Sequence, residues 1–134
     1  MLQQKPLWAA RIGAVCYLLW SGLHFQAAFA VFGTARGLPF GPVQGRVDQA
    51  AFLLLSCAIA VLVITVVLTW RNSRLGYWLN LAVAAAADAG FIAFVLLPGH
   101  APLWPGLAGP IAWVLGWAAT TYGLVARVPA SALA

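Results

Sequence analysis

Four long apolar segments decide what this chain can fold into. They cover about residues 7–32, 49–70, 75–97 and 105–124, and each is near the roughly 20 residues that a helix needs to cross a hydrocarbon core about 30 Å thick. Only 7% of the residues are charged, whereas a soluble domain carries about 25%, so the chain could not cover a surface that faces water. The sequence therefore predicts one all-α domain, residues 1–134, folded as a bundle of four antiparallel transmembrane helices in a lipid bilayer.

The basic residues predict the orientation of this bundle. Five of the seven basic side chains lie on one side of the four segments, and two lie on the other. Cytoplasmic loops carry the excess of Lys and Arg in membrane proteins, so we expect both termini in the cytoplasm and the chain in a bacterial cytoplasmic (inner) membrane. The five are Lys5, Arg11, Arg71, Arg74 and Arg127, and the two are Arg36 and Arg46.

Glycine and proline are frequent between the apolar segments. The stretch 33–48 is rich in both, and because they favour turns over helix we expect a loop there, with Asp48 as the N-cap of the second helix. The short connection 71–74 makes the second and third helices antiparallel neighbours. Pro110 is expected to kink the fourth helix. The first apolar stretch exceeds the about 7–15 residues of a secretory signal core, so we interpret it as a retained span.

One carboxylate, that of Asp88, falls in the middle of the third segment. Residues 79–94 contain no other charge, so in a membrane-spanning helix this carboxylate lies deep in the bilayer. A charged side chain at that depth costs on the order of 2.5–3.5 kcal/mol, and ionisable residues inside membranes commonly mark proton paths, ion paths and ligand sites. Asp88 is therefore the first candidate for a functional residue.

Residues on the other helices reach the same depth as Asp88. At about 1.5 Å per residue, His24, Ser56, Asp88 and Trp113 lie about 10–13 Å from the outer ends of their segments. We expect the His24 imidazole to pair with the Asp88 carboxylate, as an ion pair or as two neutral groups, because burial disfavours both charged forms. Hydroxyl groups on the same helix faces are expected to complete the network, and aromatic rings to line a pocket. The predicted site consists of Asp88, His24, Ser56, Tyr17, Trp20, Ser21, Phe91, Trp113 and Trp117.

Two interpretations of this site stay open. In the first, the chain binds or translocates a proton or a small apolar or cationic ligand, which the aromatic rings would suit. In the second, the Asp88–His24 pair is an interhelical clamp, since polar pairs across membrane helices contribute about 0.6 kcal/mol on average. A lipid-modifying enzyme that uses the pair as a general base is a more distant alternative, and the sequence does not identify a catalytic residue.

Small residues at a spacing of four suggest a third kind of role. Such ridges let helices pack closely, so the chain could also be an accessory or assembly subunit that docks into a homo- or hetero-oligomer. The ridges are Ala82, Ala86 and Gly90 in the third segment, and Ala112 and Gly116 in the fourth.

Several other chemistries receive no support from the sequence. Cys16 and Cys57 differ in depth by roughly 12 Å, more than the about 7 Å that a disulfide allows between Cα atoms, so we expect two free thiols. The two histidines, His24 and His100, lie in a helix and in a loop, which disfavours a bis-histidine haem. The net charge of +5 is scattered along the chain, which does not fit a nucleic-acid interface. We therefore predict no cofactor, no metal site and no nucleic-acid partner.

Overall fold

The computed structural model describes residues 5–126, and this part of the chain is helical apart from short turns. Three helical stretches are long and apolar enough to cross a membrane: Leu7–Arg36, Pro42–Arg71 and Arg74–Leu96. The predicted all-α fold is therefore confirmed for the described residues, whereas the fourth crossing and the orientation stay predictions. Arg127, which entered the charge argument, lies outside the described residues.

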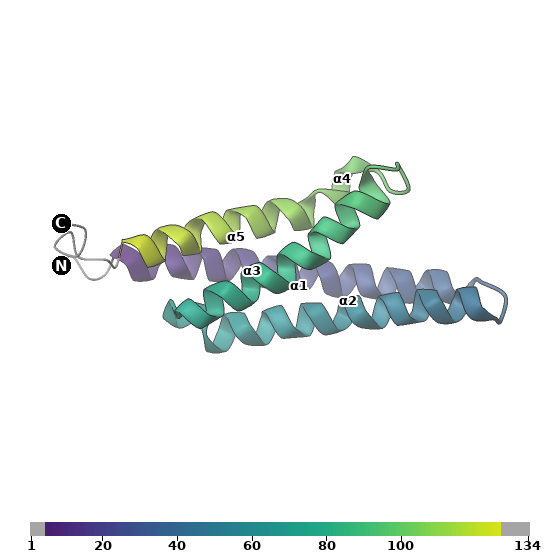
Figure 1. Ribbon diagram of the computed structural model, residues 1–134, viewed down its shortest axis with the longest axis horizontal. Helices are drawn as coiled ribbons and strands as arrows, with labels where there is room; N and C mark the ends of the chain where they lie inside the picture. Colours follow the sequence, from purple (N-terminus) through teal and green to yellow (C-terminus); the bar gives the residue numbers. More distant parts are fainter. Residues whose placement is uncertain (1–4, 127–134) are drawn as a thin grey trace.

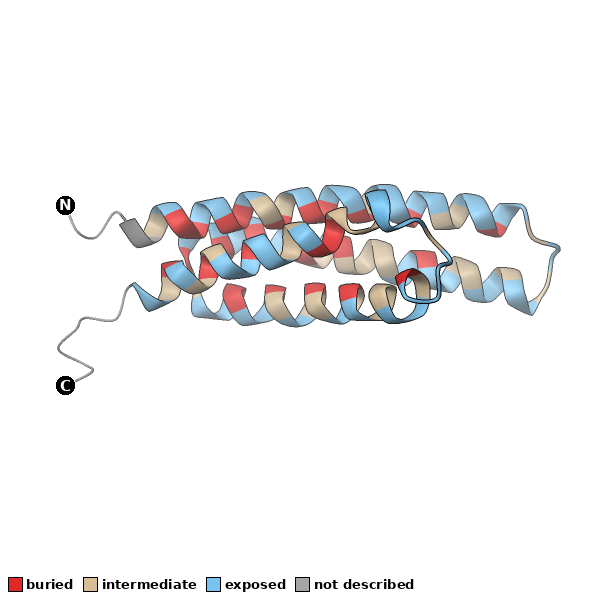
Figure 2. Cartoon of the chain, turned by 90° about the horizontal axis from the view of Figure 1, so that it is seen from above, coloured by how far each residue is buried: buried red, intermediate tan, exposed pale blue. Residues whose placement is uncertain are grey.

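The helices are arranged around the first of them. In chain order they are α1 (Lys5–Arg36), α2 (Pro42–Val67), the 3₁₀ turn η1 (Thr69–Arg71), α3 (Arg74–Phe91), the π-helical segment η2 (Ile92–Leu96), α4 (Leu103–Gly106) and α5 (Ala108–Val125). The central helix α1 packs along both α2 and α5, and α3 crosses obliquely to contact α2 and α5 (Figure 1). Buried residues form stripes on the faces that the helices turn toward one another (Figure 2).

The two ends of the molecule contain different connections between helices. The start of α1 and the end of α5 lie together at one end (Figure 1), which we call the termini end. The α2–α3 turn is also there, and the guanidinium of Arg11 on α1 lies 5.9 Å from the centroid of a Trp70 ring. The α1–α2 connection, residues 37–41, lies at the opposite end, which we call the hairpin end.

The predicted loop over 33–48 is wrong in its extent. Helix α1 continues to Arg36, and α2 begins at Pro42 with Gly41 as its N-cap. Proline is favoured at the first helical position because it needs no hydrogen-bonded N–H there, and a glycine inside a helix costs only about 1 kcal/mol. The glycines near both helix ends therefore do not stop the helices, and Asp48 lies inside α2 instead of capping it.

The third and fourth segments also differ from their predicted bounds. Ser73 caps α3, its side chain accepting a hydrogen bond from the Gly76 N–H at 3.4 Å, and the helix ends through a π-helical turn at Leu96. The fourth segment is divided between the short α4 and the longer α5. The fourth segment is interrupted at Leu107, three residues before Pro110, and Pro110 itself lies in the first turn of α5, where its missing N–H is tolerated.

Glycine brings α1 and α5 into close contact. A Cβ atom placed on Gly13 would lie 2.5 Å from Cγ2 of Thr120 and 2.8 Å from the carbonyl oxygen of Gly116. On the other side of the contact, a Cβ on Gly116 would lie 3.2 Å from the Tyr17 ring. The packing role predicted for the ridge at Ala112 and Gly116 is thus confirmed at Gly116, which is buried.

The turn between α2 and α3 is fixed by Asn72. Its backbone is left-handed, with φ 58° and ψ 40°, a conformation that asparagine adopts more easily than most other residues. Its side-chain amide donates a hydrogen bond to the carbonyl oxygen of Gly123 at 2.9 Å. The side chain therefore ties this turn to the last part of α5.

Replacing Asn72 by alanine is expected to lower the free energy of unfolding by about 2 kcal/mol. About half of this is the lost hydrogen bond, and about half is the left-handed backbone that alanine resists. The matched variant Asn72→Gly also removes the side chain but adopts the left-handed backbone without strain, so its loss should be about half as large. Titration with a denaturing detergent measures both values, and equal losses in the two variants would contradict the backbone part of the explanation.

Candidate functional site

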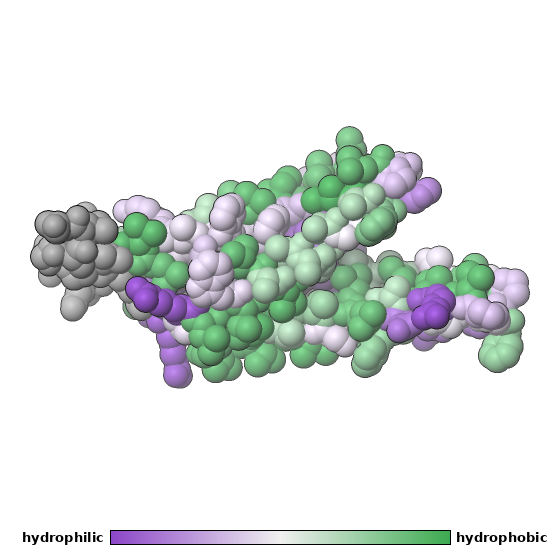
Figure 3. All heavy atoms as spheres, viewed as in Figure 1, coloured by the Kyte–Doolittle hydropathy of each residue, from purple (hydrophilic) through white to green (hydrophobic). Residues whose placement is uncertain are grey.

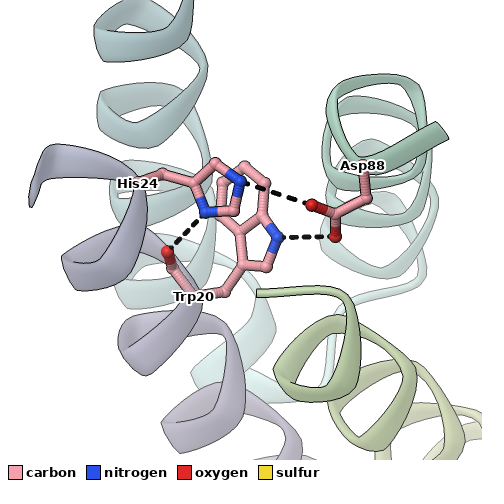
Figure 4. Close-up of polar contacts among 3 residues, drawn as sticks. All are labelled: Trp20, His24 and Asp88. Atoms are coloured by element: carbon pink, nitrogen blue, oxygen red, sulfur yellow. Dashed lines mark hydrogen bonds and ion pairs between the residues drawn. The ribbon is translucent and has the colours of Figure 1, made fainter. Parts of the chain in front are cut away.

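Three buried side chains from α1 and α3 meet in the bundle (Figure 4). The indole Nε1 of Trp20 donates a hydrogen bond to Oδ2 of Asp88 at 2.8 Å. The Nε2 atom of His24 lies 3.3 Å from Oδ1 of the same carboxylate. Asp88 and Trp20 are 0% exposed, and His24 is 8% exposed. The predicted pairing of His24 with Asp88 is therefore confirmed, and we call these three residues the Trp–His–Asp cluster.

The hydrogen bonds of His24 limit where its protons can be. Its Nδ1 atom lies 2.9 Å from the backbone carbonyl oxygen of Trp20, and a carbonyl oxygen only accepts, so Nδ1 carries a hydrogen. The Nε2 atom then faces Oδ1 of Asp88, and this contact is favourable when one proton lies between the two atoms. That proton makes either an imidazolium beside a carboxylate or a neutral imidazole beside a carboxylic acid. Both forms have zero net charge, which suits a site buried among apolar helices.

Trp20 holds both members of the pair. Its indole ring stacks on the imidazole with centroids 3.6 Å apart and planes inclined by 21°. Its side-chain N–H holds Asp88 on α3, and its backbone carbonyl holds His24 one turn later on α1. The prediction placed this residue in the site as a pocket-lining aromatic ring, and its contacts instead make it a positioning residue for the carboxylate.

The start of α5 closes over the cluster. A Cβ atom on Gly109 would lie 2.8 Å from Cε1 of His24 and 3.7 Å from Oδ1 of Asp88. Glycine at this position therefore lets the α5 backbone reach the imidazole. Gly109 is not among the predicted site residues, because the predicted fourth segment begins at residue 105 and places Gly109 only about 6 Å deep, roughly half the depth of His24.

The hydroxyl groups predicted in the network lie outside it. The hydroxyl of Ser21 donates to the carbonyl of Tyr17 at 3.0 Å, and that of Ser56 donates to the carbonyl of Phe52 at 2.8 Å. A serine inside a helix commonly bonds to the carbonyl four residues earlier, and each of these does so. The Tyr17 ring is fully buried, but its hydroxyl lies beside the Thr120 side chain.

The remaining aromatic residues of the predicted site have three different surroundings. Trp113 packs against the hydrophobic core cluster, which is formed by Tyr17, Trp20, Val61 and Ala84. Phe91 is half-buried near Gly106, the last residue of α4. Trp117 stacks on Trp113 at 6.4 Å, but its indole N–H donates to the Tyr77 hydroxyl at 2.8 Å. Trp117 therefore belongs to a separate contact between α3 and α5.

A second polar contact links α2 to α3 nearer the termini end. The side-chain amide of Asn80 donates to Oγ1 of Thr65 at 2.8 Å and to Oγ1 of Thr69 at 3.0 Å. All three residues are buried. These groups are neutral and bond to one another, so this contact is explained by helix packing.

Within residues 5–126, no group of three or more His, Cys, Asp or Glu side chains is arranged to hold a metal ion. The thiols of Cys16 and Cys57 are free. No family model matches the chain, and no curated protein or solved structure gives a significant match. The functional argument therefore depends on the geometry of the Trp–His–Asp cluster.

Proposed function

We propose that this chain is a four-span membrane protein that binds an exchangeable proton between His24 and Asp88. The observation that supports this most directly is the Nδ1–H of His24, which is committed to the Trp20 carbonyl and leaves Nε2 facing the carboxylate. One proton fits between Nε2 and Oδ1. When it is bound the pair is neutral, and when it leaves the pair carries one negative charge among apolar side chains, which is unfavourable.

The close packing of the cluster favours a proton over a larger ligand. The indole of Trp20 covers one face of the imidazole, and α5 approaches so closely that even a methyl group on Gly109 would collide with the ring. An apolar or cationic ligand would need the helices to separate. The same packing argues against a lipid-modifying enzyme, because Nε2 is directed at Asp88 and not at a substrate.

A purely structural clamp would not need a carboxylic acid at this position. Asparagine at position 88 could accept the hydrogen bond from Trp20 and donate one to Nε2 of His24, without the cost of an ionisable group in the bilayer. What aspartate adds is the ability to bind and release a proton. We therefore prefer the proton site to the clamp.

Histidine labelled with ¹⁵N provides a direct test, because the chain has only His24 and His100. In bilayers, Nδ1 of His24 is expected to stay protonated while Nε2 changes from protonated to unprotonated as the pH rises. Asp88→Asn should abolish this change, whereas Asp48→Asn should retain it. His100→Gln assigns the signals. An Nε2 signal that stays constant over the whole pH range in which the protein remains folded would exclude the proton site.

A second candidate function is an accessory subunit of a membrane complex. Its support is the ridge on α3, where Ala82 and Ala86 are exposed and a Cβ on Gly90 would meet nothing within 4 Å. The ridge therefore packs against no helix within residues 5–126 and could receive another one. Native mass spectrometry from a mild detergent tests this, because a subunit should appear as an oligomer that Ala86→Leu disrupts. A monomer in both forms would exclude self-association through the ridge.

A further inference from the structure

The Trp–His–Asp cluster lies at the edge of the section in which all the long helices pack together. Helix α5 begins at Ala108, next to the glycine that contacts His24, and the α-helical part of α3 ends at Phe91, one turn after Asp88. Beyond this level α1 continues to Arg36 alongside α2. The cluster is therefore at the last level at which α1, α3 and α5 meet.

On the hairpin side of the cluster, the helices separate into two arms. One arm is the end of the α1–α2 hairpin, and the other is the end of α3 with α4 (Figure 1). The space-filling view shows a notch between the two arms at the hairpin end (Figure 3). The notch opens on the side of the cluster on which α1 and α3 diverge (Figure 1, Figure 3).

On the termini side, the bundle is closed by packed side chains. The hydrophobic core cluster, formed by Tyr17, Trp20, Val61 and Ala84, is 0% exposed at every member. Ala84 lies one turn before Asp88 on α3, and Tyr17 lies one turn before Trp20 on α1. Farther toward the termini end, α1 and α5 are in contact through their glycines. A water molecule entering from this end would have to displace several large side chains.

Exposure within the cluster is confined to His24. Asp88 and Trp20 are fully buried, and His24 keeps the remaining exposed surface of the cluster. The titratable side chains packed nearby are Tyr17 on α1 and Cys57 on α2, and α5 contributes Gly109, which has no side chain. The imidazole is thus the one member of the cluster with exposed surface, and in our proposal it passes the proton between the buried carboxylate and the surroundings.

We infer that the pair exchanges its proton with the hairpin end only, through the notch and His24, and is sealed from the termini end. This inference depends on the proposed function. On binding, a hydronium ion at the notch loses a proton to Nε2 or Oδ1, leaving one water molecule, and the charge of the pair changes from −1 to zero. Release reverses these steps. The site would then report proton concentration on one side of the membrane, the non-cytoplasmic side if the predicted orientation holds.

Labelling of cysteines from each side of a vesicle tests this inference. In a chain with Cys16→Ala and Cys57→Ala, His24→Cys should react with a charged, membrane-impermeant methanethiosulfonate added at the hairpin end. It should not react when the reagent is added at the termini end. Tyr17→Cys, on the same helix face beyond the core cluster, is the matched control and should react from neither end.

A second pair of variants covers the case in which His24→Cys fails to fold. Phe91→Cys lies on the hairpin side of Asp88 and should react from the hairpin end, whereas Ala84→Cys lies in the core cluster and should not react. Labelling at His24 or Phe91 from the termini end would overturn the inference, and so would a lack of labelling at both positions in folded protein.

The outcomes for the inference and for the proposed function are separable. If Nε2 of His24 titrates in the ¹⁵N spectrum but position 24 is labelled from the termini end, the proton site stands and its sidedness is wrong. If position 24 is labelled only from the hairpin end but Nε2 does not titrate, the notch exists but no proton is exchanged there, and both proposals fail.

Discussion

Replacing Asp88 by alanine is expected to lower the free energy of unfolding by about 3 kcal/mol, whereas replacing it by asparagine should change it by less than about 1 kcal/mol. Alanine leaves the Trp20 N–H and the His24 Nε2 without partners, and each unpaired buried polar group costs about 1–3 kcal/mol. It also leaves a small cavity. Asparagine can make both hydrogen bonds and needs no proton to do so.

Detergent-induced unfolding of the two variants beside the wild-type chain measures this difference. The comparison separates stability from proton binding, because Asp88→Asn should keep the fold and still lose the pH response of His24. If both variants unfold as the wild type does, the hydrogen bonds of the Asp88 carboxylate contribute nothing measurable to the free energy of unfolding. If asparagine destabilises as much as alanine, the ion-pair form of the site is required for folding.

The class of fold follows from the sequence because membrane helices obey a simple length rule. About 20 apolar residues with few charges define each span, and no detail of side-chain packing enters that argument. Helix ends are harder to predict, because they depend on a balance of small energies. The α1–α2 connection shows this, since four glycines and two prolines within 33–48 indicated a long loop, while the helices leave only residues 37–41 between them.

The His24–Asp88 pair could be predicted because depth in a helix scales with residue number. The constant rise per residue places both groups at one level, and an isolated carboxylate in a bilayer needs a partner. Depth alone does not predict how each helix is rotated about its axis, and it does not predict the rotamer of each side chain. For this reason the sequence placed Trp117 in the site, although its indole bonds to Tyr77, and gave no sign that Trp20 donates to the carboxylate.

The contacts of glycine and serine residues in the helices are also difficult to predict from the sequence. A helix glycine signals close packing only if a neighbouring helix faces it, and Gly109 and Gly22 look alike in the sequence although only the first contacts another helix. Serine side chains suggested an interhelical network, but a hydroxyl on a helix can bond to its own backbone without any partner helix. Local hydrogen bonds of this kind compete with tertiary ones, and residue spacing does not distinguish between the two.

Replacing Gly13 by alanine is expected to lower the free energy of unfolding by about 2 kcal/mol, within the range for overpacked interiors. The new methyl group would lie 2.8 Å from the carbonyl oxygen of Gly116, and backbone atoms cannot move aside as the end of a flexible side chain can. The two helices must therefore separate, which weakens the α1–α5 contact and loosens the approach of α5 to His24.

Gly22→Ala is the matched control on the same helix. A Cβ atom there meets nothing within 4 Å, so this variant should keep or slightly raise stability, by up to about 1 kcal/mol, because alanine favours helix over glycine. Unfolding in mixed micelles gives both values, and the ¹⁵N signals of His24 should shift in Gly13→Ala but not in Gly22→Ala. Equal effects of the two substitutions would mean that the α1–α5 contact is not as close as its glycines indicate, and that Gly109 does not depend on it for its position over the imidazole.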